Sequence, residues 1–189
     1  MANNSHVVTG KVRLSYCNLF TPQKQSADPN AKEKYSCVVL LPKSDTATKA
    51  KIDAAIEAAK LKGQSDKWGG KIPAVVPTPL HDGDGTRPSD GEPYSAECKG
   101  CWVFSASSTV RPNVVDANVD PIMDQSEIYS GIYARVAVDF FPYNFGGKKG
   151  VGCSLGNVQK VGDGEHFGGG SVSAADDFGA PSAKDPFAL

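Results

Sequence analysis

Residues 131–145 read GIYARVAVDFFPYNF, and the alternation in this stretch decides the interpretation of the fold. Side chains of a β-strand point to the two faces of a sheet in turn, which predicts an apolar face made of Ile132, Ala134, Val136, Val138 and Phe140. The other face carries Tyr133, Arg135, Phe141 and Tyr143. Aromatic rings stack on bases and cations contact phosphates, so this face suits single-stranded nucleic acid. An ordinary amphipathic strand gives the same pattern, and the rest of the chain must decide between them.

Length and composition predict one globular domain with room for a tail. The chain has 189 residues, of which 40% are hydrophobic and 22% are charged, and this is enough for a single core. Its longest apolar run, residues 37–41, is too short for a signal peptide or a membrane span, which predicts a cytoplasmic protein without a membrane partner. The five cysteines are an odd number at irregular spacing, which favours reduced thiols over disulfides.

Four further strands and one helix are expected around this central stretch. Alternating or β-branched patterns predict strands at residues 6–16, 34–41, 101–107 and 150–161. Residues 46–62 carry an apolar stripe between two candidate N-caps, Ser44 and Asp45, and a stop at Gly63, which predicts a helix. Residues 17–30 and 63–95 are rich in proline, glycine or polar side chains and are expected to be loops. The fold class is therefore mainly β with one internal helix.

Residues 162–189 differ from the rest of the chain in charge and composition. They hold five acidic residues against Lys184, a net charge of −4, whereas the first 161 residues hold 19 Lys and Arg against 16 Asp and Glu, a net charge of +3. This composition predicts a disordered acidic tail after a folded domain at residues 1–161. Apolar side chains beside acidic ones suit docking to a partner protein. The residues expected to make the tail's contacts are Asp176, Asp177, Phe178, Asp185, Phe187 and Leu189.

The sequence leaves open two kinds of enzyme and a structural virion protein as alternatives. A metal-dependent nuclease requires a set of carboxylates, for which the candidates are Asp82, Asp84, Asp90 and Glu92. A thiol enzyme or a zinc site would use Cys98 and Cys101. Neither set has the further ligands or the paired base that these chemistries need. Glycine- and proline-rich strands allow a virion protein, but that role leaves the acidic tail unexplained. The sequence therefore favours a protein without catalytic residues, metal or cofactor.

Four motifs carry a resemblance to a known family. They are VRLSYCNLF at residues 12–20, PLHDGDG at 79–85, IYSGIYARVAVDFFPYNF at 128–145 and GVGCSLGNVQKV at 150–161. With the strand pattern and the acidic tail, they make the chain resemble the phage single-stranded DNA-binding proteins of the OB-fold type. The resemblance implies a small five-stranded Greek-key barrel. It also implies binding of single-stranded DNA during phage DNA replication and recombination in the host cytoplasm, and a tail that recruits replication proteins.

The residues expected to contact DNA are cations and aromatic residues on predicted outer faces and loops. They are Lys11, Arg13, Tyr16, Phe20, Trp102, Arg111, Tyr133, Arg135, Phe141, Tyr143, Lys148 and Lys149. We expect them to bind and protect single strands with little sequence preference, and to bind duplex DNA more weakly. Because the tail is acidic and tethered, we also expect it to compete with DNA for the basic groove.

Overall fold

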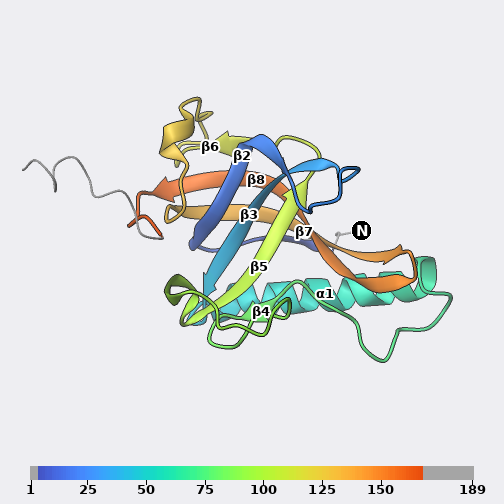
Figure 1. Ribbon diagram of the computed structural model, residues 1–189. Coiled ribbons are helices and arrows are strands. Elements are labelled where there is room, and N and C mark those ends of the chain that lie inside the picture. Colours follow the sequence, from blue (N-terminus) through green and yellow to red (C-terminus); the bar gives the residue numbers. More distant parts are fainter. Residues whose placement is uncertain (1–3, 168–189) are drawn as a thin grey trace, which may run out of the picture.

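Five long strands close into a barrel in the computed structural model, which describes residues 4–167 (Figure 1). They are β2 (Val12–Lys24), β3 (Glu33–Pro42), β5 (Cys101–Ser108), β7 (Tyr133–Phe145) and β8 (Lys148–Gly162). Antiparallel pairing joins β2 to β3, β3 to β5, β8 to β7 and β7 back to β2, and a parallel contact joins β5 to β8. This closed order confirms the predicted five-stranded Greek-key barrel of the OB-fold type.

Short elements decorate the barrel within the described residues. They are β1 (His6–Val8), β4 (His81–Asp82), β6 (Val114–Val115) and the 3-10 turns η1 (Ala96–Cys98) and η2 (Gln125–Glu127). β1 pairs with β7, β4 with β5, and β6 with β8. Nowhere in residues 4–167 is there a helix long and apolar enough to span a membrane.

The predicted alternation of β7 is confirmed on its apolar face. Ile132, just before the strand, and Ala134, Val136, Val138 and Phe140 are all at most 2% exposed. The ring of Phe140 packs against Phe104 of β5 at a centroid distance of 6.3 Å. Alternate residues of β7 therefore build the centre of the barrel, which leaves the opposite face of the strand free for other contacts.

Helix α1 (Thr46–Asp66) is the predicted internal helix, and it packs against β7 below the barrel in Figure 1. The carboxylate of Asp45 caps it by accepting hydrogen bonds from the backbone N–H and the hydroxyl of Thr48, at 3.0 and 2.6 Å. The helix does not end at Gly63 as predicted. A Cβ on Gly63 would lie 2.8 Å from atoms of both Trp68 and Pro142, so this glycine permits close packing instead of terminating the helix.

Strand β2 is much longer than the sequence pattern indicated. The expected loop at residues 17–30 is wrong over its first part, because β2 continues to Lys24. A bulge is the reason: the register with β3 shifts between Ser15 and Asn18, and Tyr16 has a positive φ of 48°. An extra residue in one strand reverses the faces of those that follow, which hides the two-residue period from a reading of the sequence.

The start of the expected tail lies against the barrel. β8 ends at Gly162, and the backbone N–H of Phe167 donates to the Ser130 carbonyl at 3.0 Å. The rings of His166 and Tyr129 stack with centroids 3.9 Å apart. The expectation that order is lost directly after Val161 is therefore wrong for residues 162–167. The predicted tail contacts, Asp176, Asp177, Phe178, Asp185, Phe187 and Leu189, lie outside the described residues.

Substituting Gly63 tests the packing of the helix, because packing and helix propensity predict opposite changes in the free energy of unfolding. Gly63→Ala should lower the free energy of unfolding by about 1–3 kcal/mol, because the added methyl group overpacks the contact with Trp68 and Pro142. Helix propensity alone predicts a gain of up to about 1 kcal/mol. Urea unfolding measures the difference. Ser65→Ala, at an exposed position of the same helix, should stay within about 0.5 kcal/mol of the parent; a more stable Gly63→Ala protein would contradict the packing.

Candidate nucleic-acid interface

The outer faces of β2, β3 and β5 lie at the front of the barrel in Figure 1. In barrels of this type, the face of the second and third strands and two hairpin loops bind oligonucleotides. Here these strands are β3 and β5, and the loops are residues 25–32 and 146–147. Cross-strand register arranges the outward side chains in two rows, Arg13–Leu40–Val103 and Ser15–Val38–Ser105.

A cavity of about 320 Å³ opens on the second row, and we call it the barrel-face pocket. Its volume lies at the lower end of the range of about 300–1,000 Å³ for ligand sites. Strands β2, β3 and β5 and the segment at residues 79–98 enclose it. The lining residues are Ser15, Tyr16, Val38, Leu40, Pro79, His81, Arg87, Tyr94, Ser95, Glu97, Cys98, Val103, Phe104 and Ser105. Aromatic rings, apolar walls and open polar groups therefore surround one hollow.

Tyr16, a predicted DNA contact, lies in the wall of this pocket and is 72% exposed. Its φ of 48° is rare for a residue with a side chain, and holding this conformation costs on the order of 1 kcal/mol or more. The backbone N–H of Tyr16 donates to the hydroxyl of Ser130 at 2.9 Å, which helps to hold the bulge. The bulge thus presents a large aromatic ring to solvent at the pocket mouth.

Three predicted contacts, Lys11, Arg13 and Tyr133, come together where β2 meets β7. The Arg13 guanidinium lies 5.1 Å from the centroid of the Tyr133 ring, and the Lys11 Nζ lies 5.2 Å from it. Arg13 also donates to the carbonyls of Gly131, at 3.1 and 3.0 Å, and Glu165, at 2.6 Å. Backbone acceptors therefore already occupy Arg13, whereas Lys11 remains exposed.

Phe167 covers the row of outward side chains that begins with Arg13. Its ring lies 4.2 Å from the Arg13 guanidinium, and it packs on a small apolar cluster that includes Leu40, Val103 and Tyr94. Leu40, Val103 and Tyr94 also line the barrel-face pocket. Phe167, the last described residue, therefore lies directly beside the pocket.

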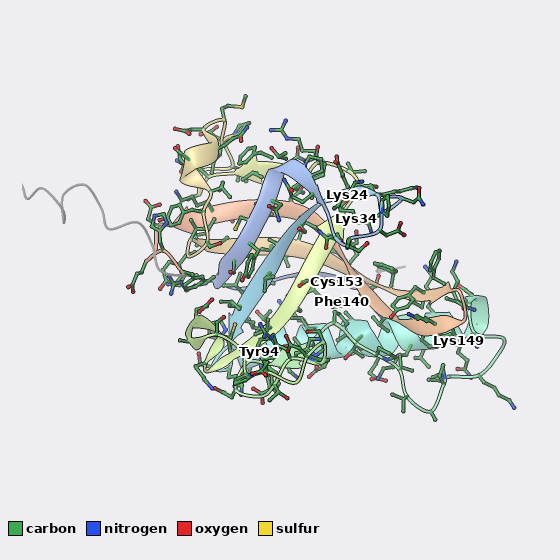
Figure 2. The ribbon with its side chains drawn as sticks, viewed as in Figure 1. Lys24, Lys34, Tyr94, Phe140, Lys149 and Cys153 are labelled. Atoms are coloured by element: carbon green, nitrogen blue, oxygen red, sulfur yellow. The ribbon has the colours of Figure 1, made fainter. Side chains whose placement is uncertain are left out.

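Four other predicted contacts, Phe141, Tyr143, Lys148 and Lys149, lie on the hairpin of β7 and β8, which we call the arm (residues 141–150). Figure 2 shows Lys149 near the end of the arm, far from Tyr94 of the barrel-face pocket. The exposed Phe141 ring lies over Gly152 and the Tyr143 ring over Gly150, where an added Cβ would clash with the rings at 2.5 Å. The arm thus carries aromatic rings and cations, as expected.

The remaining predicted contacts are not part of either group. Arg111 lies 5.4 Å from the Phe20 ring, beside a separate groove of about 630 Å³. Arg135 is exposed on β7, and its Nε donates to the Thr9 carbonyl at 3.3 Å. Trp102 lies on the core side of β5, with Lys43 and Lys49 5.0 and 4.6 Å from its ring. Because Trp102 packs against the core cluster and is not among the residues that line the pocket, it does not join the outer surface.

Sequence reasoning missed the pocket residues His81, Arg87, Tyr94 and Glu97, and the exposed ring of Phe145 at the arm's tip. A tyrosine in an otherwise polar loop is the only signal that pointed to Tyr94. Burial raises the pKa of Tyr94 and lowers the pKa of His81, so both side chains are neutral near pH 7. Figure 2 also places Lys24 and Lys34 at the β2–β3 hairpin, another basic site that was missed.

Three of the four carboxylates suggested for a nuclease, those of Asp82, Asp84 and Asp90, have structural partners. The Nζ of Lys43 donates to Asp82 and Asp84 at 2.6 and 2.7 Å, and these bonds lower the pKa of both carboxyls. Arg87 pairs with Asp90 at 2.8 Å. Burial raises the pKa of the Cys98 and Cys101 thiols, which is opposite to the shift of an activated nucleophile. Within residues 4–167, no three His, Cys, Asp or Glu side chains gather as a possible metal site.

Comparison with known proteins identifies close structural relatives. The single-stranded DNA-binding protein of bacteriophage Enc34, solved in complex with single-stranded DNA, matches with a TM-score of 0.72 and 29% identity over 87% of this chain and 90% of that chain. The T7 protein gp2.5, a single-stranded DNA-binding protein, shares the fold with a TM-score of 0.55 and 15% identity over 89% of this chain and 97% of that chain.

Sequence comparison leads to the same family. Protein p50 of Acyrthosiphon pisum secondary endosymbiont phage 1 is 35% identical over 177 residues, which cover 88% of this chain and 89% of p50. The profile of the family described as Enterobacter phage Enc34, ssDNA-binding protein, matches residues 5–188. The resemblance inferred from the four motifs is therefore confirmed. This chain belongs to the family of the Enterobacter phage Enc34 ssDNA-binding protein.

Proposed function

We propose that this protein binds and protects single-stranded DNA during phage DNA replication and recombination in the host cytoplasm, without a catalytic step. The barrel-face pocket carries the proposal, because it places Tyr16 and Tyr94 on the oligonucleotide-binding face of the barrel. Membership of the family supports it, as does the Enc34 relative that was solved with single-stranded DNA.

The proposed DNA path runs from the pocket across the outer face to the two hairpins. Bases stack on Tyr16 and Tyr94 at the pocket and on Phe141 and Tyr143 on the arm, and each stack contributes about 1–3 kcal/mol with little sequence preference. Phosphates meet the exposed or half-buried cations of the face and the hairpins, which are Lys11, Lys24, Lys34, Lys148 and Lys149. Paired bases cannot reach these rings, so duplex DNA binds more weakly.

The acidic tail is proposed to compete with DNA for this path and to recruit replication proteins. Support comes from Phe167, which packs beside the pocket and so holds the start of the following segment next to the DNA path. A tether of this kind keeps Asp176, Asp177 and Asp185 at a high local concentration near the cations. Phe178, Phe187 and Leu189 supply apolar side chains for a partner's pocket.

Substitutions of Tyr16 test whether its ring stacks on a base or only supports the fold. Tyr16→Ala should weaken binding to oligo-dT by about 1–3 kcal/mol, the range for one base stacked on an aromatic ring. Fluorescence titration measures the affinity, and thermal unfolding checks that the exposed position tolerates the change. Tyr16→Phe keeps the ring and should retain the affinity. Equal binding by the alanine variant would remove Tyr16 from the path.

Removing a lysine from the arm should change the salt dependence of DNA binding. Each lost phosphate contact reduces the slope of log affinity against log salt by about 0.7 for single strands, and Lys148→Ala should show a reduction of this size. Lys51→Ala, which removes an exposed cation from α1, is the matched control and should leave the slope unchanged. The same slope in the Lys148→Ala protein and its parent would place the arm outside the DNA path.

Competition by the tail predicts an effect of truncation that depends on salt. A chain that ends at Phe167 lacks Asp176, Asp177 and Asp185 but keeps the contact with Arg13. It should bind oligo-dT more tightly than the full chain at low salt, and the gain should shrink at high salt because screening already weakens the tail. Asp176→Asn with Asp177→Asn in the full chain should give part of the same gain. Unchanged or weaker binding by the truncated chain across the salt range would show that the tail does not compete.

A further inference from the structure

One carboxylate, Glu97, lies in the wall of the pocket to which we assign DNA bases. The acidic neighbours Asp82, Asp84 and Asp90 are held by Lys43 or Arg87. Glu97, on η1, is half-buried and makes no hydrogen bond or ion pair with any residue between 4 and 167. A free carboxylate repels DNA phosphates, so its place in a DNA site is favourable only if it accepts a hydrogen bond from the ligand.

The floor of the pocket offers further open polar groups. Ser15 and Ser105 belong to the same cross-strand row, and neither hydroxyl has a hydrogen-bond partner among the described residues. No side-chain polar atom in the described residues is both buried and unpaired. The hydroxyls of the floor and the carboxylate of the wall are therefore open to a molecule that enters the pocket. Such groups favour a polar base edge over an apolar occupant.

We propose that this pocket takes one nucleobase and that Glu97 makes it prefer a base with an N–H donor on the edge that enters. A glutamate accepts from the N4 amino group of cytosine, whereas thymine presents the O4 acceptor at the same ring position. Thymine carries its one N–H donor at ring position 3, between the O2 and O4 acceptors, so a carboxylate that faces ring position 4 meets an acceptor and stays unpaired. Glu97 is the one carboxylate in the pocket wall, so the preference is limited to the single base that faces it. This inference rests on the proposed DNA-binding function.

Oligo-dC and oligo-dT of equal length test the inference directly, because these bases have similar size and differ at position 4. Titrations use the full-length protein at mildly alkaline pH, where cytosine is unprotonated. Oligo-dC should bind about tenfold more tightly than oligo-dT, the effect of one hydrogen bond to a charged group. Glu97→Gln should bring the two affinities together, because a rotating amide can face either a donor or an acceptor.

Glu92→Gln is the matched control, since it removes the same charge from an exposed position of the same segment, outside the pocket lining. It should keep the dC-to-dT ratio of the parent, even if both affinities rise because one negative charge is lost. If the Glu97→Gln protein fails to fold, oligo-dC with two methyl groups on N4 replaces it, and the parent protein should then lose its preference. Equal affinities of the parent for dC and dT, or the same ratio in both variants, would overturn the role of Glu97. Failure to bind either oligonucleotide would instead overturn the proposed function.

Discussion

The barrel depends on a very short closing contact between β2 and β7. Only two residue pairs, Val12 with Ala134 and Arg13 with Tyr133, lie in register there. Hydrogen bonds beside them extend the closure: the N–H of Gly131 donates to Leu14 and the N–H of Leu14 donates to Ile132, at 2.8 and 3.1 Å. Gly131 has a φ of 121° and its Cβ position is filled by the Glu165 carbonyl, so only glycine fits. One small region thus contains the β2–β7 contact, the docked residues 165–167 and the cations Lys11 and Arg13.

This sharing changes the role of Arg13. Its side chain donates to two backbone carbonyls and lies between the rings of Tyr133 and Phe167. A hydrogen bond from a charged group is worth about 1.5–3 kcal/mol. Arg13 would have to break such bonds to contact a phosphate, and this loss would offset much of the binding free energy gained there. The exposed Lys11 has no such hydrogen bonds, so under the proposed function it is the better phosphate contact at this position. Charge and spacing in the sequence did not distinguish the roles of Arg13 and Lys11, whereas their contacts in the folded chain do.

Local periodicity predicted individual strands and the helix, and the family resemblance implied the barrel, but neither predicted the pocket. The alternation of residues 131–145 and the capped helix after Asp45 are local signals, and the structure confirms both elements. The bulge at Tyr16 broke the pattern of β2 and shortened the predicted strand. The pocket joins three strands to residues 79–98, so its aromatic and acidic residues become neighbours only through tertiary structure. The core-side position of Trp102 has a related cause, since strand register, and not residue type, decides which face a side chain occupies.

The arm differs from the pocket in that it holds its aromatic rings against the backbone of the neighbouring strand. A stacking platform gains affinity when its rings are held in place before the ligand arrives, because less side-chain entropy is then lost on binding. Gly152 and Gly150 lie opposite Phe141 and Tyr143, and each ring rests on the bare backbone of its glycine. Trp68 reinforces the base of the arm by donating its Nε1–H to the Tyr143 carbonyl at 2.9 Å. The first two glycines of the motif GVGCSLGNVQKV, Gly150 and Gly152, leave room for the rings of Tyr143 and Phe141. Under the proposed function these glycines therefore support the binding surface, although they present no side chain to DNA.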